Sequence, residues 1–355
     1  MRRDPVVDGH APDSEATMIA TRSSSPGTRH RPTMRAVVGR AYGSSDLLAL
    51  DSIGKPAVGD GDVLVRVHAA GLDQGVWHTV TGLPYGVRAA GFGLLKPRTP
   101  VPGCDVAGVV ESVGSGVTRF RVGDAVFGTC AGAFAEYAST AEDRLALKPT
   151  TISFEQAAAV PSSGIAALQG LRDVGKVHAG QHVLVIGAGG GVGTFAVQLA
   201  TAFGAQVTGV CSTSKVALVR SLGADHVVDY TVEDLADRPA RYDLVLDTGG
   251  DRSLASLREV LTPAGTLVIV GGEGGGQLLG LSRQLRAMAL SPFVRQSLAV
   301  VFSSPRSDDL ALLTELLATG TVVPAVDRTF PLGEVPEAVR YLRAGRARGK
   351  VVITV

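Results

Sequence analysis

The sequence predicts an α/β protein in which a doubly wound parallel sheet is joined to a second, irregular β domain. A chain of 355 residues is too long for one small hydrophobic core, so two domains are expected. Short strands punctuated by glycine fill the chain from Met34 to about Ser153. Beyond Ser153, apolar strands alternate with amphipathic helices, which is the pattern of a parallel sheet covered on both faces.

Composition limits the classes of function. Lys and Arg number 34 against 33 Asp and Glu, so the formal net charge of +1 offers no large positive field to nucleic acid or anionic lipid. No run of about 18 apolar residues is available to span a membrane. The nearest candidate, Ala287 to Phe302, is interrupted by Arg295 and is interpreted as a core helix or an interface. The sequence therefore predicts neither a nucleic-acid partner nor a membrane partner.

The first 33 residues form a separate region. They are rich in Arg, Pro, Ser, Thr and Asp and lack a sustained apolar pattern, so residues 1–33 are predicted to be a disordered extension. An Arg-Arg pair near the start is not followed by the apolar core that export signals need. The three cysteines, Cys104, Cys130 and Cys211, have no C-x-x-C spacing, which argues against a disulfide framework and favours a reducing cytoplasm.

Alternating residues predict the strands of the first domain. Within Asp62 to Ala70, valines alternate with other residues, so the valines share one face of the predicted strand. Asp105 to Val113 and Asp124 to Phe127 are further β-rich runs bounded by glycine. The Pro-rich and Gly-rich stretch from Pro84 to Pro102 is predicted to be a long loop, and long loops in compact domains are often functional.

A helix start marks the change to the second pattern. Ser153 and Gln156 match a capping box, in which the two side chains satisfy each other's backbone N–H groups. The strands and helices expected after it are His182–Ile186, Val192–Phe203, Gln206–Cys211, Lys215–Leu222, Val227–Val228, Asp243–Leu246, Ser253–Leu261 and Thr266–Val270. After about Ser303, the expected elements are helices over Asp308–Ala318 and Pro336–Ala344 and a last strand over Lys350–Val355.

The most informative segment joins a strand to a helix through a glycine cluster. After the strand, the spacing Ala188-x-Gly190-x-x-Gly193 matches the dinucleotide fingerprint, with Ala in place of the first Gly. Ala188 permits the tight turn, Gly190 lets the backbone approach a pyrophosphate, and Gly193 lets the helix pack on the strand. The helix start, including Gly191 and Val192, directs N–H groups and the positive end of its dipole at the phosphates. A glycine turn with a purely structural role is the alternative.

The end of the next strand indicates which dinucleotide binds. NAD-selective sites carry Asp or Glu about 20 residues on, where the carboxylate binds the ribose 2′-hydroxyl. Here Ser212, Thr213 and Lys215 occupy that place, so hydroxyls and an ammonium are available to a 2′-phosphate. The sequence therefore predicts NADPH. The alternative is that Ser212 or Thr213 caps the following helix, and both uses can coexist.

Several ordered motifs carry a family likeness. They are Pro102–Val110 (PGCDVAGVV), Gly114–Val117 with Arg121–Asp124, Gly189–Gly193, Leu222–Asp225 with Asp229–Tyr230, and Gly349–Val352. Over residues 34–355 the chain resembles the zinc-free quinone oxidoreductase branch of the medium-chain dehydrogenase/reductase superfamily, which reduces quinones or enones with NADPH. The resemblance implies a GroES-like irregular β-barrel catalytic domain formed by 34–155 and 303–355, and a Rossmann domain formed by 156–302. It also implies a homodimer, for which the apolar stretch Leu285 to Val301 is the candidate contact.

The resemblance also assigns roles to single positions. It implies that Lys350 contacts a phosphate, that Tyr230 lies beside the cofactor's phosphate and ribose, and that the backbone of Val270 and Gly271 holds the nicotinamide. Without the resemblance, Lys350 is interpreted as a solvated charge, Tyr230 as a half-buried packing residue and Gly271 as a turn.

The same likeness raises the question of zinc, which related alcohol dehydrogenases hold through Cys, His and Cys. The corresponding positions here are Asp73, Cys104 and Ser162. A neutral Ser is a poor third ligand, because zinc favours nitrogen and thiolate donors, so no catalytic metal is expected. Cys104 is then interpreted as a small buried residue. Without a Lewis acid, reduction of a quinone or an activated C=C bond is favoured over alcohol oxidation.

Candidates for the catalytic side are Asp73, Trp77 and His78. Related reductases often show Asn-Pro-x-Asp here, and this chain departs from it with Asp73 and Val76 in the Asn and Asp positions. Asp73 or His78 is able to donate or relay a proton, although a loop histidine without a catalytic role is the alternative. Trp77 is a candidate wall for a flat substrate, and packing between domains is its alternative.

Two other functions stay open on the sequence alone. One is a zinc-dependent alcohol dehydrogenase with atypical ligands, which metal analysis would identify. The other is a non-catalytic NADPH-binding sensor, because a dinucleotide fingerprint indicates binding better than turnover. The expected function is an NADPH-dependent oxidoreductase acting on a small-molecule quinone or enone.

Overall fold

A computed structural model of the chain describes residues 32–235, 241–250, 252–271 and 282–355. The chain divides after Pro32, and the unit Thr33–Val355 is the one described below. The prediction of a disordered extension over residues 1–33 falls almost wholly outside the described residues. Among the described helices, none combines the length and the hydrophobicity that spanning a bilayer requires.

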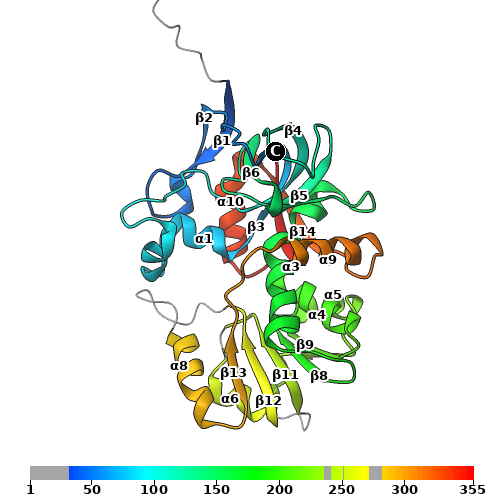
Figure 1. The fold of residues 1–355 in the computed structure, drawn as a ribbon. Helices are drawn as coiled ribbons and strands as arrows, with labels where there is room; N and C mark the ends of the chain where they lie inside the picture. Colours follow the sequence, from blue (N-terminus) through cyan, green and yellow to red (C-terminus); the bar gives the residue numbers. More distant parts are fainter. Residues whose placement is uncertain (1–31, 236–240, 251, 272–281) are drawn as a thin grey trace, which may run out of the picture. The chain divides into compact units, whose positions relative to one another are not determined.

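A parallel six-stranded sheet forms the middle of the chain, with the strand order β10-β9-β8-β11-β12-β13 (Figure 1). Its strands are β8 (His182–Ile186), β9 (Gln206–Cys211), β10 (His226–Asp229), β11 (Tyr242–Asp247), β12 (Leu261–Ile269) and β13 (Ser297–Val300). Every neighbouring pair runs parallel. The order reverses direction at β8, so the doubly wound sheet predicted from the alternating pattern is confirmed.

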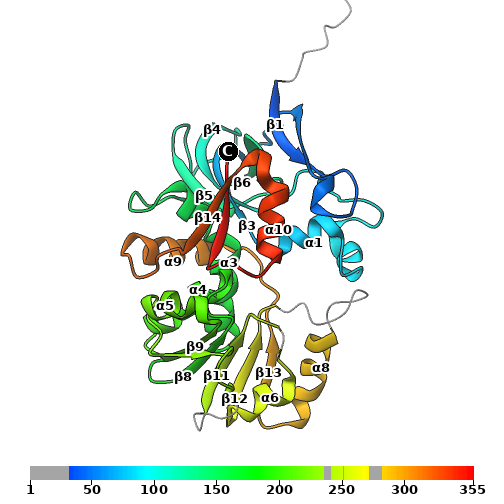
Figure 2. The same ribbon diagram turned by 180° about the vertical axis from the view of Figure 1, so that it is seen from behind.

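Helices cover both faces of this sheet, with α4 and α5 on one side and α6 and α8 on the other (Figure 2). The helices of this part are α2 (Phe154–Ala158), α3 (Pro161–Leu168), α4 (Gly191–Ala202), α5 (Val216–Ser221), α6 (Leu254–Glu259) and α8 (Ser282–Leu290). Val183 and Val185 of β8 belong to the core cluster that contains Phe195 of α4. Leu184, between them, belongs to the opposite cluster with Leu257 of α6. Alternate strand residues are therefore buried on opposite faces.

Segments from both ends of the unit build a second, mostly antiparallel sheet. Its order is β14-β15-β3-β4-β5-β7, and β6 pairs with β3. The strands are β3 (Asp62–Leu72), β4 (Asp105–Val113), β5 (Ala125–Thr129), β6 (Tyr137–Ala141), β7 (Leu145–Leu147), β14 (Val326–Pro331) and β15 (Lys350–Thr354), while β1 (Thr33–Val38) and β2 (Ala49–Gly54) form a separate pair. β15 runs antiparallel to β3, with Val352 opposite Gly71. The last strand of the chain therefore joins the sheet of its N-terminal half.

Three further helices accompany this sheet, and local signals explain where helices start. They are α1 (Gln74–Thr81), α9 (Ser307–Ala318) and α10 (Val335–Arg343). α1 starts directly after β3 at its N-cap Asp73 and ends at Gly82, whose φ of +63° suits glycine. The predicted capping box is confirmed at α2, where Ser153 and Gln156 exchange hydrogen bonds.

The segment from Ala287 to Phe302 is not the single core helix considered from the sequence. α8 ends at Leu290, and after one short helical turn the chain enters β13, where Leu298 is buried. Pro292 lacks the N–H that a continuing helix needs. A short apolar run fits a buried strand as well as a helix, so the pattern alone did not decide between them.

A buried ion-pair network joins the start of α9 to the chain after α3. Asp309 is 1% exposed and accepts hydrogen bonds from Gln169 at 2.7 Å, Arg172 at 2.6 Å and Arg306 at 3.1 Å. We expect Asp309→Ala to lower the free energy of unfolding by about 3 kcal/mol in urea denaturation, because three donors lose their shared acceptor. Asp308→Ala, at the exposed neighbouring position, should change it by less than about 0.5 kcal/mol. Equal small effects of the two substitutions would contradict this account.

Candidate functional site

The bend between β8 and α4 carries the dinucleotide fingerprint. Gly187 has a φ of +76°, a left-handed value that suits glycine, and Gly190 is the N-cap of α4. A Cβ atom at Gly193 would lie 2.1 Å from the Gly187 carbonyl oxygen, so only glycine lets α4 approach β8 this closely. A Cβ atom at Gly190 would meet only that same oxygen, at 3.3 Å. The space above Gly190 is therefore open, at the place where a helix start offers N–H groups to an anion.

Some of the remaining residues of the bend are packed inside the protein, and others can be reached by a ligand. Ala188 is fully buried, and its N–H donates to the Val210 carbonyl oxygen at 3.0 Å. Gly191 and Val192 form the first turn of α4 and are half-buried. A ligand at the helix start can reach the backbone of these two residues, whereas Ala188 serves the turn itself.

The start of β15 lies against the same bend. Gly349 forms a parallel bridge with Gly190, which carries Lys350 to the start of α4. A Cβ atom at Gly191 would lie 3.1 Å from the Cδ atom of Lys350. Lys350 is 2% exposed, and its Nζ donates to the Ser163 hydroxyl at 3.1 Å. The interpretation of Lys350 as a solvated surface charge is therefore wrong.

The turn after β9 holds the residues predicted to bind a 2′-phosphate. Ser212 is at the N-cap of the short helical turn Thr213–Lys215, but its hydroxyl makes no capping hydrogen bond. The aliphatic stem of Lys215 crosses the glycine bend, and its Nζ donates to the Gly345 carbonyl oxygen at 3.3 Å. Desolvation lowers the pKa of half-buried Lys215, the charge of Asp327 opposes this effect, and the charge of Arg348 adds to it. A carboxylate and a second cation therefore lie close to Lys215.

A carboxylate that the sequence analysis missed lies beside this turn. Asp229 ends β10 and accepts a hydrogen bond from the Thr231 hydroxyl at 2.7 Å. Hydrogen bonds from the side chains of Thr213 and Thr231 hold the pKa of Asp229 below its usual range. Asp229 lies on the strand next to β9, opposite Cys211 in register, so a search about 20 residues beyond the bend does not reach it.

Three positions implied by the family likeness follow the carboxyl ends of parallel strands. Tyr230 follows β10 and is 55% exposed, so its interpretation as a half-buried packing residue is wrong. Val270 follows β12, and its N–H donates to the Asp247 carbonyl oxygen at 3.0 Å. Gly271 is the last described residue before the gap at 272–281. All three share the sheet edge at which ligands of doubly wound folds bind.

The three candidate catalytic residues lie at or in α1, and each has a local structural partner. Asp73 caps the first turn of the helix. The Nδ1 atom of His78 lies 2.6 Å from the Leu83 carbonyl oxygen. Because a carbonyl only accepts, Nδ1 carries the proton and Nε2 is the basic nitrogen of the neutral ring. The Trp77 ring lies 4.1 Å from the Arg343 guanidinium and meets the His78 ring edge-on at 5.1 Å.

A buried polar cluster that the sequence analysis missed lies where β4 begins. Asp105 is 1% exposed, and its Oδ1 accepts hydrogen bonds from the Ser162 hydroxyl at 2.5 Å and the Ser162 N–H at 3.0 Å. Its Oδ2 lies 3.7 Å from the Nζ of Lys350. Gly71 leaves room for this side chain, since a Cβ atom there would lie 2.9 Å from that of Asp105. The available signal was the acidic residue inside the PGCDVAGVV motif.

Burial and clustered charge shift two pKa values at this point. Burial raises the pKa of Asp105 to about 7, while the Lys350 ammonium opposes the rise and Asp73 adds to it. Burial, with the charges of Asp73 and Asp105, raises the pKa of the Cys104 thiol to about 12. Cys104 is nevertheless open to solvent on one side, so its interpretation as a small buried residue is wrong.

These donors do not suit zinc. Of the three positions Asp73, Cys104 and Ser162, only Cys104 offers the soft donor that zinc favours. The Ser162 hydroxyl donates to Asp105, and Asp73 is engaged as a helix cap. No group of three or more His, Cys, Asp and Glu residues in the described part of the chain is placed to hold a metal ion.

The raised pKa of Asp105 makes its contribution to stability depend on pH. The native carboxyl keeps its proton up to about pH 7, whereas the unfolded chain releases it near 3.8, so this contribution falls as the pH rises between those values. We expect the difference in unfolding free energy between the wild type and Asp105→Asn to decrease from about pH 4 to about pH 7 and then to level off. Urea denaturation at each pH measures it. A difference that does not vary with pH would show that the native carboxyl is ionised throughout.

Comparisons with known proteins agree with this arrangement. The family model of the alcohol dehydrogenase GroES-like domain matches residues 59–151, and that of the zinc-binding dehydrogenase matches residues 222–353. The 2-methylene-furan-3-one reductase of Solanum lycopersicum is 35% identical over 328 residues, which cover 88% of this chain and 76% of that protein. The chain belongs to the medium-chain dehydrogenase/reductase family.

Two more members of the medium-chain dehydrogenase/reductase family are similar along most of their length. The chloroplastic NADPH-dependent alkenal/one oxidoreductase of Arabidopsis thaliana is 35% identical over 344 residues, covering 90% of this chain and 79% of that protein. A solved quinone oxidoreductase from Coxiella burnetii superposes with a TM-score of 0.78 at 28% identity, covering 91% of this chain and all of the other. The chain is thus an oxidoreductase of this family. One matching family model is described as zinc-binding, whereas Asp73, Cys104 and Ser162 do not form a zinc donor set.

Proposed function

We propose that this medium-chain dehydrogenase/reductase is an NADPH-dependent reductase of quinones or activated C=C bonds that works without a catalytic metal. The open glycine bend between β8 and α4, with Lys215 beside it, is the observation that carries the proposal. Two relatives are named as an alkenal/one oxidoreductase and a furanone reductase, and a structural neighbour is named as a quinone oxidoreductase. The name of one relative also specifies NADPH.

The cofactor's diphosphate is proposed to lie over the N–H groups of Gly190, Gly191 and Val192. The helix dipole favours negative charge at this position, and the open space at Gly190 allows close approach. Lys350 adds a buried ammonium close to the same helix start. The backbone of Val270–Gly271, at the carboxyl edge of the sheet, is the proposed contact of the nicotinamide.

A 2′-phosphate is proposed to bind at the turn after β9. Its proposed contacts are Ser212, Thr213, Lys215 and Tyr230. Lys215 and the nearby Arg348 place two cations there. Asp229 opposes a phosphate, but its carboxylate already accepts hydrogen bonds from threonine side chains. Asp327 adds a second carboxylate near Lys215, and its Oδ2 already accepts a hydrogen bond from the Tyr341 hydroxyl. Two cations beside two carboxylates that are both engaged favour NADPH over NADH.

The chain's own residues orient the substrate and deliver the proton, while the bound cofactor supplies hydride to the electrophilic carbon of the substrate. Trp77 is the proposed wall for a flat substrate, since its ring is fixed against Arg343. Proton delivery is assigned to Asp73 or His78. His78 can donate from Nε2 only as the imidazolium, because Leu83 holds its Nδ1–H.

A homodimer and a cytoplasmic location complete the proposal. β13 is the last strand in the sheet order, so one edge of Ser297–Val300 is unpaired within the described residues. Such edges readily pair with another chain, and neighbouring Phe293 is 84% exposed. The location rests on three free cysteines, as expected in a reducing compartment. The proposed domains are 34–155 with 303–355 and 156–302, and the presence of two large sheets supports the division into two.

Absorbance of NADPH, followed with a panel of quinones, enones and aldehydes, tests the proposed function. Each assay is repeated with NADH and after treatment with a chelator. We expect quinones or enones to oxidise NADPH faster than NADH, with no effect of the chelator. A zinc-dependent alcohol dehydrogenase would lose activity and contain about one zinc per chain. A sensor would bind NADPH tightly without oxidation by any acceptor, and either result would reject the proposal.

A further inference from the structure

We infer that the loop Tyr85–Arg98, called the docking loop below, binds an anionic lipid surface from which the enzyme takes an apolar quinone or enone. The nature of the substrate rests on the proposed function, whereas the argument for lipid rests on the loop itself. The docking loop follows α1 after three residues and lies in the stretch Pro84–Pro102, which the sequence predicts to be a long functional loop. The structure differs from that prediction over Arg88–Phe92, which form a short helical segment.

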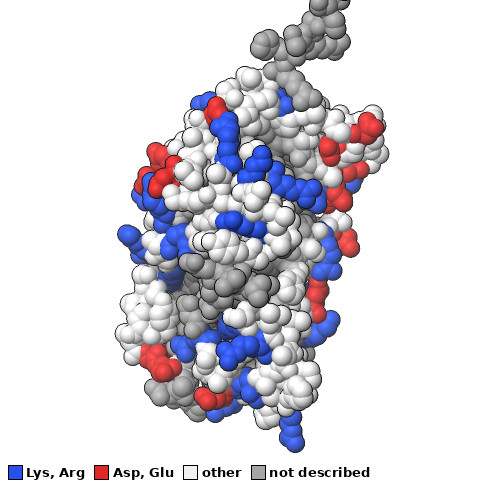
Figure 3. Space-filling model, turned by 90° about the vertical axis from the view of Figure 1, so that its left-hand side faces the viewer, with Lys and Arg blue, Asp and Glu red and all other residues white. Residues whose placement is uncertain are grey.

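The docking loop carries cations without neighbouring acids. No Asp or Glu occurs between Gln74 and Cys104, whereas the loop contains Arg88, Lys96 and Arg98. Lys96 and Arg98 are exposed and form no ion pair with any described residue. On the side of the molecule that carries α1, Lys and Arg occupy the middle of the face and Asp and Glu lie mostly at its rim (Figure 3). The net charge of +1 is a sum over the whole chain and hides the local excess of Lys and Arg on this face. It therefore does not exclude an anionic surface as a partner.

Adjacent leucines form the apolar part of the docking loop. Leu94 is 70% exposed and Leu95 is 92% exposed. Tyr85 and Phe92 of the same loop are 50% and 37% exposed. Several large apolar side chains exposed within one short segment favour a surface that is covered in use.

The loop is braced, so the leucines are presented rather than folded onto the protein. The Tyr42 hydroxyl lies 2.8 Å from the Phe92 carbonyl oxygen and 2.6 Å from that of Gly93. The Arg88 guanidinium lies 4.4 Å from the Tyr42 ring and 4.8 Å from the Tyr85 ring. Arg88 also donates from Nε to the Gly82 carbonyl oxygen at 2.9 Å. After the tip, Leu94–Leu95, the Arg98 N–H donates to the Phe92 carbonyl oxygen at 2.8 Å, so both ends of the tip are fixed.

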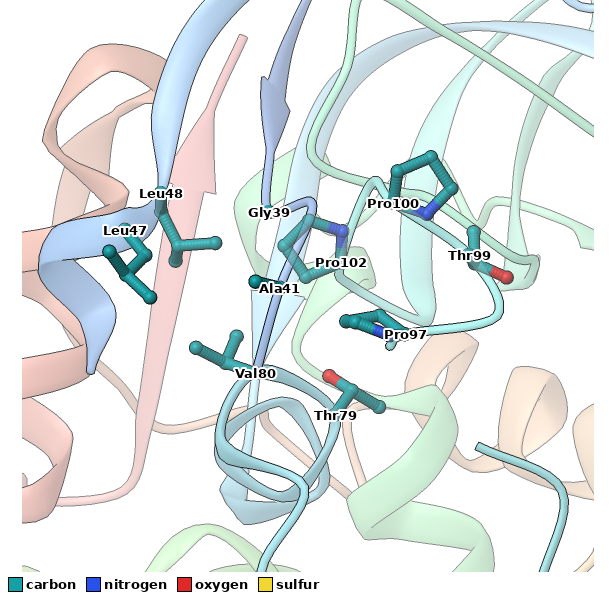
Figure 4. A pocket seen from close by; sticks show the side chains of 10 residues that line it. All are labelled: Gly39, Ala41, Leu47, Leu48, Thr79, Val80, Pro97, Thr99, Pro100 and Pro102. Atoms are coloured by element: carbon teal, nitrogen blue, oxygen red, sulfur yellow. The ribbon is translucent and has the colours of Figure 1, made fainter. Parts of the chain in front are cut away.

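A small cavity lies beside the chain that follows the tip. Pro97, Pro100 and Pro102 line a cavity together with Leu48 and with Val80 of α1 (Figure 4). Its volume is ≈ 10 Å³, room for about one water molecule. The cavity cannot hold a substrate, so the apolar residues there support the loop instead.

Area and charge together favour lipid over a protein partner. A stable protein interface needs about 800 Å² on each partner, far more than the tip of one loop provides. A bilayer needs no matching shape, because apolar side chains enter its surface while Lys and Arg remain at anionic headgroups. An apolar quinone dissolved in the bilayer would then be concentrated beside the enzyme.

Sedimentation of the full chain with lipid vesicles tests the inference. Vesicles of phosphatidylcholine alone are compared with vesicles containing about one third phosphatidylglycerol. We expect binding only to the second kind, with release at high salt. Two double variants should each lower the partition coefficient at least about tenfold. One combines Leu94→Ser with Leu95→Ser, and the other combines Lys96→Gln with Arg98→Gln.

A matched control changes another exposed cation and its apolar neighbour, Arg121→Gln with Val122→Ser, where Val122 is 64% exposed. This variant should bind vesicles like the wild type. No binding to either vesicle, or wild-type binding by the leucine variant, would overturn the inference. So would analytical ultracentrifugation in which the leucine variant alone loses a dimer, because the tip would then be an interface between copies. Failure of the wild type to reduce a water-soluble quinone would reject the proposed function instead, since vesicle binding is measured separately.

Discussion

Gly190→Val should weaken NADPH binding at least about 100-fold, or about 3 kcal/mol, and lower the melting temperature by no more than a few degrees. Gly190 has a φ of −96°, which any residue can adopt, and a Cβ atom there would meet only the Gly187 carbonyl oxygen at 3.3 Å. The protein therefore accepts the side chain, whose methyl groups occupy the space proposed for the diphosphate. Fluorescence titration with NADPH and a thermal denaturation scan measure the two effects.

Two other glycines provide the contrast. Gly333→Val, where a Cβ atom would meet nothing within 4 Å, should change neither property. Gly193→Ala should damage both, because its Cβ would lie 2.1 Å from the Gly187 carbonyl oxygen. Undiminished NADPH affinity in Gly190→Val would place the diphosphate elsewhere.

Lys215→Ala should raise the Kd for NADPH about 30-fold, or about 2 kcal/mol, and that for NADH less than about twofold. The ammonium is proposed to contact only the 2′-phosphate, which NADH lacks. Arg121→Ala, at a cation between β4 and β5 whose side chain is 90% exposed, is the matched control and should leave both values unchanged. Titrations of each variant with both cofactors give the comparison.

Equal losses of affinity for both cofactors would mean that Lys215 supports the glycine bend and does not bind the 2′-phosphate. A wild type that prefers NADH would point to Asp229, whose carboxylate would then bind a ribose hydroxyl. In that case Asp229→Asn should raise the affinity for NADPH, because the opposing charge is removed.

Local patterns predicted the elements that depend on neighbouring residues. The spacing Ala188-x-Gly190-x-x-Gly193 and the alternation after Ser153 placed the bend and the parallel sheet, since turn geometry and hydrophobic period are properties of short segments. The stretch Ala287–Phe302 shows the limit, because a short apolar run does not distinguish strand from helix.

The missed residues depend on contacts between distant segments. Asp105 and Lys350 meet because β4 and β15 both pair with β3. Asp229 comes to the turn after β9 only through the register of β10. Such contacts are set by strand pairing across the sheet, which no single segment of the sequence contains. Strand pairing also sets the surroundings of Cys104. It lies beside two carboxylates and is exposed, whereas the sequence predicted a small buried residue.

A dinucleotide on the bend between β8 and α4 is the feature on which the proposed activity depends. The most direct measurement follows the backbone amide resonances of Gly190, Gly191 and Val192 while NADP⁺ is titrated. These resonances should shift and saturate with the same Kd that fluorescence gives for the protein as a whole. Saturation of the protein with cofactor while these three amides stay unchanged would contradict the assignment.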